Sequence, residues 1–208
     1  MIGPPEVIVF DLGGVVVDFQ GAEGMRAMTG GAHDLDFCRE HWHRLSELDL
    51  FERGAVSPAL FADAFIREWR LGLDRAQFID GFRRWVRGHV DGAPELLRGL
   101  KGRYRLACLS NLNEVHWERC VEIGTPSLFD AHFLSFEMGV RKPEPEIYAR
   151  VAAALGIAPS AICFLDDVRA NVDAARRAGM RGLLVENGDA GAALAAAGII
   201  ESPPFVAG

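Results

Sequence analysis

Hydrophobic and polar residues follow two different patterns along the chain. From Asp91 onward, short apolar runs alternate with stretches whose apolar residues have the spacing of an amphipathic helix. Residues 7–10 form another apolar run, rich in β-branched side chains and typical of a strand buried on both faces. Further strands are predicted over residues 104–109, 131–134, 161–165 and 183–185. This alternation predicts an α/β fold, with a Rossmann-like parallel sheet flanked by helices.

Proline and glycine mark the helix boundaries within the alternating region. Helices are predicted over residues 94–100, 113–123, 145–155 and 168–178, and an alanine-rich helix follows the last strand. Pro145 suits a first helical turn, because the backbone nitrogen at that position needs no hydrogen-bond partner. Gly124, Gly156 and Gly179 follow three of the helices, and glycine commonly ends a helix at this position.

Residues 19–89 show helical periodicity and no strand pattern. One predicted helix spans residues 37–48, a second begins at Pro58, and a third extends from Asp74 to Val86. The predicted domains are a discontinuous core, residues 1–18 and 90–208, and a small all-helical insertion, residues 19–89.

The composition argues against several classes of function. The 208 residues carry a formal net charge of −7 and no basic run, so the chain offers no stripe for nucleic-acid phosphates. No apolar stretch approaches the roughly 18 residues that span a bilayer, and the N-terminus lacks a signal-peptide pattern. Four scattered cysteines are expected to be reduced, which favours a cytoplasmic protein. From the charge and the lack of an apolar span, no nucleic-acid or membrane partner is expected. The tail, residues 203–208, is expected to be loose.

Polar side chains follow three of the predicted strands at the point where each strand ends. They are Asp11, Ser110 with Asn111, and Asp166 with Asp167. Because parallel strands place their carboxyl ends at one edge of a sheet, these residues are expected to share the edge where α/β proteins bind ligands. Lys142 follows the short strand over residues 131–134 by a loop and precedes a helix, so it can join them.

The charges at this edge predict a cation. Three carboxylates in one crevice repel one another, and burial strengthens the repulsion. Lys142 can compensate one charge, and a hard divalent cation with oxygen ligands can compensate the rest. Mg²⁺ suits carboxylates, water and phosphate, whereas no cluster of cysteine and histidine indicates zinc.

Each candidate residue also has a simpler interpretation. Asp11 alone could start a turn, and Lys142 alone could be a solvated loop residue. His41 and His43 resemble a metal-binding pair, but residues two positions apart on a helix point to different faces. His89 is expected to be a hinge or loop residue. The convergence of several clusters, rather than any one residue, therefore carries the functional prediction.

Four motifs resemble those of the haloacid dehalogenase (HAD) superfamily of hydrolases, and the match covers essentially the whole chain. They are Phe-Asp-Leu-Gly-Gly-Val at 10–15, Leu-Ser-Asn at 109–111, Gly-Val-Arg-Lys-Pro at 139–143 and Phe-Leu-Asp-Asp at 164–167. The helical insertion resembles the C1 cap of this superfamily, in which the sequence Phe51-Glu52-Arg53-Gly54 is also familiar. The chain is similar to the branch that contains α-D-glucose-1-phosphate phosphatase and the phosphatase domain of soluble epoxide hydrolase.

The resemblance implies a Mg²⁺-dependent phosphatase that acts through an aspartyl-phosphate on Asp11. Its implied substrate is a small phosphorylated metabolite, with a sugar phosphate as one candidate, and a monomer or homodimer is expected. The implied catalytic residues are Asp11, Ser110 and Lys142. The implied substrate-binding residues are Leu12, Gly13, Ser110, Asn111 and Lys142. The implied metal ligands are Asp11, the Gly13 carbonyl, Asp166 and Asp167, with Asn171 supporting the metal site.

One position departs from the pattern of the superfamily. Most of its phosphatases carry a general acid and base two residues after the nucleophile, where this chain has Gly13. General acid catalysis contributes about 10²–10⁴-fold. Three interpretations stay open: a leaving group that needs little protonation; another acid, such as Asp18, His116 or a cap histidine; or a weakly active or non-catalytic protein that binds phosphorylated ligands.

A 2-haloacid dehalogenase is the alternative enzyme. It would use Asp11 as its nucleophile without a metal, and Tyr148 also occurs in that branch. Asp166 and Asp167 argue against this alternative, because two further negative charges would repel the carboxylate of a haloacid.

Overall fold

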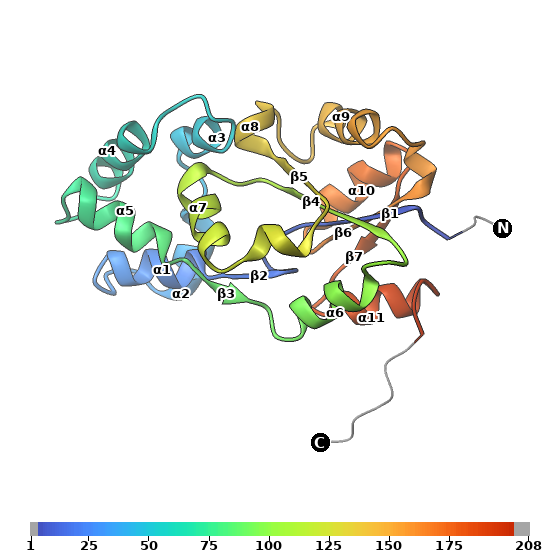
Figure 1. The fold of residues 1–208 in the computed structure, drawn as a ribbon. Helices are drawn as coiled ribbons and strands as arrows, with labels where there is room; N and C mark the ends of the chain where they lie inside the picture. Colours follow the sequence, from blue (N-terminus) through green and yellow to red (C-terminus); the bar gives the residue numbers. More distant parts are fainter. Residues whose placement is uncertain (1–3, 202–208) are drawn as a thin grey trace, which may run out of the picture.

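A five-stranded parallel sheet forms the centre of the molecule in the computed structural model, which describes residues 4–201 (Figure 1). The strand order is β5-β4-β1-β6-β7, so the first strand of the chain lies in the middle. The strands are β1 (Val7–Phe10), β4 (Arg105–Ser110), β5 (Ala131–Leu134), β6 (Ile162–Asp166) and β7 (Arg181–Leu184). The predicted Rossmann-like α/β fold is confirmed, and β7 begins two residues before its predicted start.

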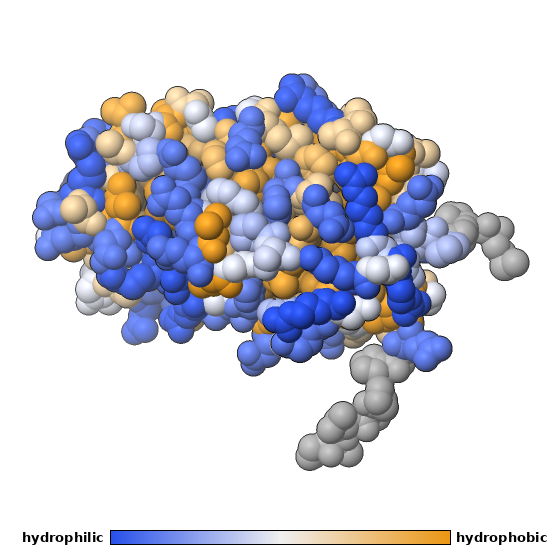
Figure 2. Space-filling model, viewed as in Figure 1, coloured by the Kyte–Doolittle hydropathy of each residue, from blue (hydrophilic) through white to orange (hydrophobic). Residues whose placement is uncertain are grey.

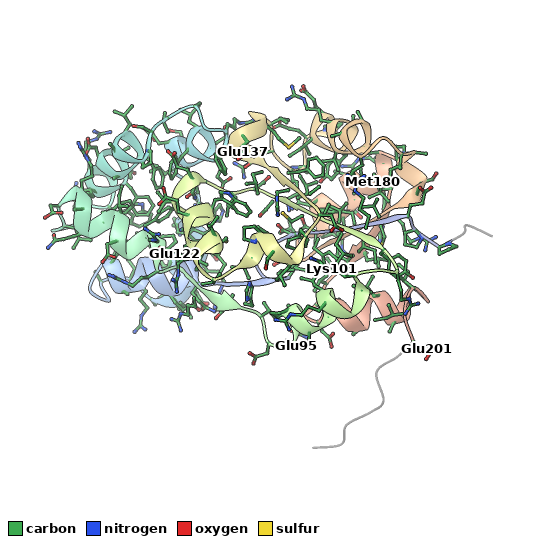
Figure 3. The ribbon with its side chains drawn as sticks, in the orientation of Figure 1. Glu95, Lys101, Glu122, Glu137, Met180 and Glu201 are labelled. Carbon is green, nitrogen blue, oxygen red and sulfur yellow. The ribbon has the colours of Figure 1, made fainter. Side chains whose placement is uncertain are left out.

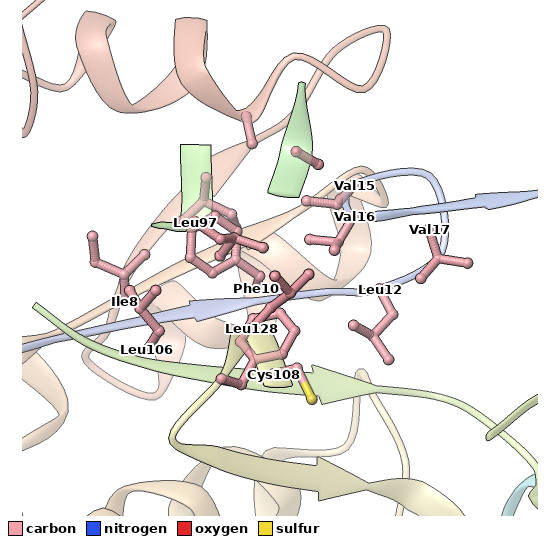
Figure 4. Close-up of a cluster of buried hydrophobic side chains, with 14 of the residues drawn as sticks. Ile8, Phe10, Leu12, Val15, Val16, Val17, Leu97, Leu106, Cys108 and Leu128 are labelled. Carbon is pink, nitrogen blue, oxygen red and sulfur yellow. The ribbon is translucent and has the colours of Figure 1, made fainter. Parts of the chain in front are cut away.

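The side chains of β1 point alternately into two cores, one on each face of the sheet. Ile8 and Phe10 are fully buried in the core that also holds Leu97 and Leu106 (Figure 4). Val9 belongs to the opposite core. The first core is covered by α6 (Ala93–Leu100) and α11 (Ala190–Ala196), and the second by α9 (Pro145–Leu155) and α10 (Arg169–Arg177). Burial on both faces explains why this strand is apolar throughout.

Shorter elements complete the sheet-containing part. They are α7 (Glu114–Glu122), a 3₁₀ turn at Thr125–Leu128, α8 (Ser135–Met138) and a second 3₁₀ turn at Pro159–Ala161. The predicted helices after β4, β5 and β6 are thus present. Gly124 and Gly156 adopt positive φ angles of 83° and 73° directly after helical segments, as expected for glycines that end a helix.

A third core holds together five helices from the first half of the chain. They are α1 (Gly21–Met28), α2 (Leu35–His41), α3 (Ser46–Glu52), α4 (Pro58–Glu68) and α5 (Arg75–Arg83). Buried aromatic rings fill this core, and the ring centroids of Phe51 and Phe61 are 4.5 Å apart. In Figure 1 these helices gather to the left of the sheet, beyond the end of β1. The tryptophans and phenylalanines of this region therefore serve mainly as its core.

Two strands occur where the helical pattern predicted none. β2 (Val17–Phe19) pairs antiparallel with β3 (Val86–His89), and this ribbon leads the chain out of the core and back. Val86 was expected at the end of a helix, because it continues the apolar spacing of Phe82. The prediction was wrong because a strand of four residues is too short to establish a period of two, and only Val86 is buried in it.

The predicted helix over residues 37–48 is also wrong in part. The chain forms α2 and α3 instead, separated by a turn in which the amide of Arg44 donates to the carbonyl of His41 at 3.0 Å. Leu45 is extended, with φ −67° and ψ 125°, so the helix cannot continue through it. Apolar residues on both sides of the turn face the same core, which preserves a helical spacing across a break in the helix.

The surface carries dispersed charge. Apolar patches on the face in Figure 2 are interrupted by polar side chains, and Figure 3 shows Glu95 and Glu201 extending outward. Among the described residues, no helix has both the length and the apolar character needed to cross a membrane. The tail for which we predict a loose conformation, residues 203–208, lies outside the described residues.

Candidate active site

Asp11 lies at the carboxyl end of the central strand. Its amide donates to the carbonyl of Leu165 at 2.8 Å, which continues the pairing of β1 with β6 by one residue. The side chain is buried, with 7% of the residue exposed, and the amide of Leu12 donates to its Oδ1 at 2.7 Å. This hydrogen bond fixes the carboxylate against the backbone of the following turn.

A tight turn carries the chain away from Asp11. The carbonyl of Leu12 accepts the amides of Val16 at 2.8 Å and Val17 at 2.7 Å. Within the turn, Gly14 has a φ of +72°, and a Cβ at this position would lie 2.5 Å from Oδ2 of Asp167. A glycine is therefore needed here for two reasons, its backbone conformation and the close approach of a second carboxylate.

Asp166 and Asp167 bring two further carboxylates to the same place. Asp166 ends β6 and is fully buried, and its Oδ1 accepts the amide of Val168 at 2.8 Å and Nδ2 of Asn171 at 3.0 Å. Asp167 is exposed. Carboxylate oxygens of Asp11, Asp166 and Asp167 all lie within 4.8 Å of one another, so the predicted convergence at one edge of the sheet is observed.

Lys142 also reaches this cluster. Only 1% of its side chain is exposed, and Nζ lies 2.9 Å from Oδ1 of Asp11 and 2.6 Å from Oδ2 of Asp166. Asn111, just after β4, holds the loop of Lys142: its Oδ1 accepts the Lys142 amide at 2.8 Å and its Nδ2 donates to the Lys142 carbonyl at 2.9 Å. The side chain of Asn111 thus positions Lys142.

The cluster contains more negative than positive charge. Burial raises the pKa of Asp11 to about 7; the charge of Lys142 opposes this shift and that of Asp166 adds to it. Burial alone would lower the pKa of Lys142, but the charges of Asp11 and Asp166 outweigh it and raise this pKa above its usual range. Asp167 is exposed as a whole residue, but partial desolvation of its carboxyl group and the charge of Asp166 raise its pKa as well. Three carboxylates beside one ammonium group therefore form a site that favours a further cation.

The donor atoms of this cluster fit a magnesium ion. Three carboxylates within 4.8 Å supply hard oxygen ligands, and no cysteine or histidine belongs to the group. Such a set suits Mg²⁺, which also retains water and phosphate oxygens in its coordination sphere. Nδ2 of Asn171 donates to the carboxylate of Asp166. The backbone carbonyl of Asn171 in turn accepts a hydrogen bond from the hydroxyl of the buried Tyr148 at 3.0 Å. Tyr148 therefore serves to position Asn171.

A cavity of about 90 Å³ lies between this edge of the sheet and the helical region. Gly13, Ser110 and Asn111 border it on the sheet side, and Ser110 is buried at the end of β4. Its opposite wall is formed by aromatic side chains of the helical region and the ribbon: Phe19, Trp42 and Phe82. The cavity therefore joins the residues predicted to bind phosphate to the helical insertion.

Among the histidines, all of which the structure describes, His116 lines this cavity. It is buried, its Nε2 lies 2.9 Å from the Phe82 carbonyl, and its Nδ1 lies 3.1 Å from Nδ2 of Asn113. Because a carbonyl must accept and an amide nitrogen must donate, the imidazole carries its proton on Nε2. Burial lowers the pKa of His116 to about 4, so the ring is neutral at pH 7 and holds its only proton in a hydrogen bond. His116 is thus poorly suited to replace the missing acid.

We expect His116 to make the protein sensitive to acid. The imidazole has an ordinary pKa of 6.5 and a folded-state pKa of about 4, so between these values the unfolded chain binds more protons than the folded one. The free energy of unfolding should therefore fall by up to about 3 kcal/mol as pH drops from 6.5 to 4. Urea unfolding of wild type and His116→Gln at several pH values measures this, and equal slopes for both proteins would contradict it.

The other predicted acids lie elsewhere. Asp18 accepts a hydrogen bond from Nε2 of Gln20, and Asp18 and His89 line a separate groove of about 590 Å³. Nε2 of His89 lies 3.0 Å from Oγ1 of Thr125. His41 stacks on Phe37, with ring centroids 4.0 Å apart. None of these groups is among the described residues that line the cavity beside Gly13.

One buried carboxyl group at the cavity was missed. Glu52 lines it, at the end of α3, and its neighbour Arg53 forms an ion pair with Glu144 near Lys142. Arg141 pairs with Asp49 at 2.8 Å. The only signal in the sequence was the familiar phrase at residues 51–54, which did not indicate what the glutamate contacts.

Comparison with known proteins agrees with this geometry. A family model described as haloacid dehalogenase-like hydrolase matches residues 5–179. D-ribitol-5-phosphate phosphatase of Bacteroides thetaiotaomicron is 28% identical over 87% of this chain and 92% of its own. Glyceraldehyde 3-phosphate phosphatase of Methanopyrus kandleri is 26% identical over 79% of this chain and 74% of its own.

A solved structure has the same fold. It is a HAD family enzyme of Bacteroides thetaiotaomicron in complex with magnesium and inorganic phosphate, with a TM-score of 0.75 and 24% identity over 88% of this chain and 96% of that one. The motifs, the parallel sheet and a family match over most of the chain lead to one conclusion: the protein belongs to the haloacid dehalogenase-like hydrolase family.

Proposed function

We propose that the protein is a Mg²⁺-dependent phosphatase that hydrolyses a small phosphorylated metabolite through an aspartyl-phosphate on Asp11. The observation that carries this proposal is the convergence of Asp11, Asp166 and Asp167 within 4.8 Å, with Lys142 2.9 Å from Asp11. Two phosphatases among the relatives, for D-ribitol-5-phosphate and glyceraldehyde 3-phosphate, support a hydroxylated substrate of a few carbons.

In the proposed reaction, Asp11 acts as the nucleophile. One of its carboxylate oxygens forms a bond to phosphorus, the bond from phosphorus to the ester oxygen breaks, and the leaving alcohol takes up a proton from water. Water then cleaves the acyl phosphate, which releases inorganic phosphate and restores Asp11. Ser110, the backbone amide of Asn111 and Lys142 would bind the phosphoryl oxygens, where negative charge must be stabilised. Leu12 and Gly13 would contribute backbone atoms to the same pocket.

Asp11, the Gly13 carbonyl, Asp166 and Asp167 are the proposed ligands of Mg²⁺. When bound, the ion would offset the excess negative charge of the cluster and stabilise the charge of the phosphoryl group. Asp166 is held by Asn171 and by the amide of Val168, so its orientation is set before any ion binds. A structure of the same fold with magnesium and inorganic phosphate bound supports this assignment.

The helical region is the proposed cap. We place the cap at residues 19–89 and the core domain at 1–18 and 90–208, because the β2–β3 ribbon connects them near both boundaries. The cavity between the two parts, about 90 Å³, would exclude water during the reaction and select the leaving group.

A screen of phosphorylated metabolites with and without Mg²⁺ tests the function. Purified protein should release inorganic phosphate from small phosphate esters in the presence of Mg²⁺, and EDTA should remove at least about 90% of the activity if metal-dependent charge stabilisation is essential. 2-Chloropropionate serves as the control for a dehalogenase. Halide release without added metal would contradict the proposal, and binding of phosphate esters without turnover would indicate a non-catalytic protein.

Cellular context stays a prediction. Four free, buried cysteines agree with a cytoplasmic location, since reduced thiols are normal there. A small phosphorylated metabolite is the expected partner. We further propose a monomer or homodimer without nucleic-acid or membrane partners.

A further inference from the structure

Glu52 is a buried carboxyl group that the proposed reaction does not use. Only 9% of the residue is exposed, and its Oε2 has no hydrogen-bond partner. The guanidinium Nη2 of Arg141 lies 3.1 Å from Oε2, so the charge is compensated, although the contact lacks the direction of a hydrogen bond. An acceptor that is buried without a hydrogen bond costs free energy, and such groups in native proteins often have a functional reason.

The backbone around Glu52 is held firmly against the sheet-containing part. The hydroxyl of Ser135 donates to the carbonyl of Glu52 and accepts the amide of Leu112. A Cβ at Gly54, which has a φ of +68°, would lie 2.2 Å from the carbonyl of Phe136, so this part of the chain lies directly on the core. The end of α3 is therefore fixed relative to β4 and the loop that follows it.

This anchoring places the side chain of Glu52 at the cavity beside the nucleophile. Glu52 borders the same cavity of about 90 Å³ as Gly13 and Ser110. Two other polar side chains in the lining are already engaged: that of Asn113 bonds with His116, and the ring of His116 bonds with the Phe82 carbonyl. Phe19, Trp42 and Phe82 make much of the remaining wall apolar.

We propose that the carboxyl group of Glu52 binds a hydroxyl group of the leaving alcohol, and so selects polyol phosphates over esters of unsubstituted alcohols. This inference rests on the proposed phosphatase function. The juxtaposition that carries it is a buried carboxyl group with an oxygen that has no hydrogen bond, on a residue at a fixed helix end that lines the cavity between the sheet edge and the helical region.

Selectivity follows from the cost of an acceptor whose hydrogen-bonding capacity is not met. A polyol supplies a hydrogen bond to the carboxyl group, whereas an alkyl chain in the same place leaves it with the Arg141 ion pair and no hydrogen bond to Oε2. The cavity is small, about 90 Å³, so short leaving groups are the first ones to compare.

Paired substrates test this inference. The kcat/KM of the Mg²⁺-loaded enzyme is measured for glycerol 1-phosphate and for propyl phosphate, which share a three-carbon chain. Wild type should prefer the glycerol ester, and Glu52→Met should reduce that preference by about 10- to 100-fold, the loss expected for one hydrogen bond to a charged group. Glu52→Gln, which retains an acceptor oxygen, should show an intermediate preference. Intrinsic reactivity of the two esters is the same for every variant, so the change in the ratio isolates the contact.

Asp49→Asn is the matched control. Asp49 lies on the same helix and pairs with the same Arg141, but it is not among the cavity-lining residues. This variant should keep the wild-type preference, because it weakens the Arg141 ion pairs without removing the acceptor. A loss of preference in Asp49→Asn equal to that in Glu52→Met would show that Glu52 acts only by anchoring the helix, and would overturn the inference.

The outcomes separate the two proposals. If wild type hydrolyses phenyl phosphate but Glu52→Met lowers kcat/KM equally for both three-carbon esters, the inference about Glu52 fails and the phosphatase proposal stands. If wild type with Mg²⁺ hydrolyses none of the three esters, the phosphatase proposal fails and the inference fails with it. Near-wild-type thermal unfolding of each variant ensures that the ratios refer to folded protein.

Discussion

Asp11→Asn is expected to reduce phosphatase turnover by at least about 10⁴-fold, the scale seen when the nucleophile of a covalent mechanism is removed. An amide oxygen is a weak nucleophile, and it cannot form the acyl phosphate from which water releases the product. The substitution keeps the shape of the side chain, so Leu12 can still donate its hydrogen bond to position 11. Single-turnover and steady-state phosphate release from the Mg²⁺-loaded enzyme measure the loss.

The same substitution should leave stability unchanged or increased. Burial and the charge of Asp166 raise the pKa of Asp11 to about 7 against the opposing charge of Lys142, which means that the folded protein disfavours the charged carboxylate. A neutral amide removes this unfavourable charge, in keeping with the trade-off between stability and activity at active sites. Thermal unfolding without added metal tests this, and a clear loss of stability would show that the carboxylate is needed for folding.

Asp173→Asn is a matched control for this pair of results. Asp173 lies on α10, and its ion pair with Arg176 is largely exposed. Exposed pairs of this kind contribute about 0–1 kcal/mol, so both activity and stability should stay close to wild type. Wild-type activity in Asp11→Asn would rule out the proposed mechanism, whatever the control shows.

Lys142→Met is expected to damage both activity and stability. The ammonium group is the basic side chain that contacts both Asp11 and Asp166, at 2.9 Å and 2.6 Å. Removing one partner of a buried ion pair leaves uncompensated charge and costs about 3–5 kcal/mol. For a chain of this length that corresponds to a fall of roughly 10 °C in the melting temperature. Turnover should also fall by at least about 10²-fold, because a charge that stabilises the phosphoryl group is lost.

A double variant separates the charge effect from the loss of packing. The double variant Lys142→Met with Asp11→Asn replaces one of the two carboxylates that lose their ammonium partner by a neutral amide. Part of the stability lost in Lys142→Met should therefore return. Urea unfolding of the two single variants and the double variant gives the coupling between the residues. Additive effects would mean that Lys142 stabilises the protein through its methylene groups and not through its charge.

The chemistry of the candidate site could be predicted because it follows strand ends. Asp11 and Asp166 each end an apolar run, and parallel strands necessarily place such residues at one edge of a sheet. Excess negative charge at that edge then predicted a cation, and the structure places Lys142 there. These steps need only local patterns and the direction of the strands, so they required no knowledge of distant contacts.

The partners of the helical region could not be predicted in the same way. Glu52 meets Arg141, and His116 meets the carbonyl of Phe82, across separations in sequence that no local pattern records. The β2–β3 ribbon was missed for a related reason, since strand pairing stabilises a segment too short to show a period of its own.

Local sequence patterns were thus sufficient to predict the fold class, the family resemblance and the residues at the sheet edge. Tertiary structure alone decided how the helical region lies on the core, which residues line the cavity, that His116 is buried and neutral, and that Glu52 is buried at the cavity beside Arg141. The physical reason is that hydrophobic periodicity specifies which face of an element is buried, whereas hydrogen bonds, ion pairs and pKa values depend on which elements meet.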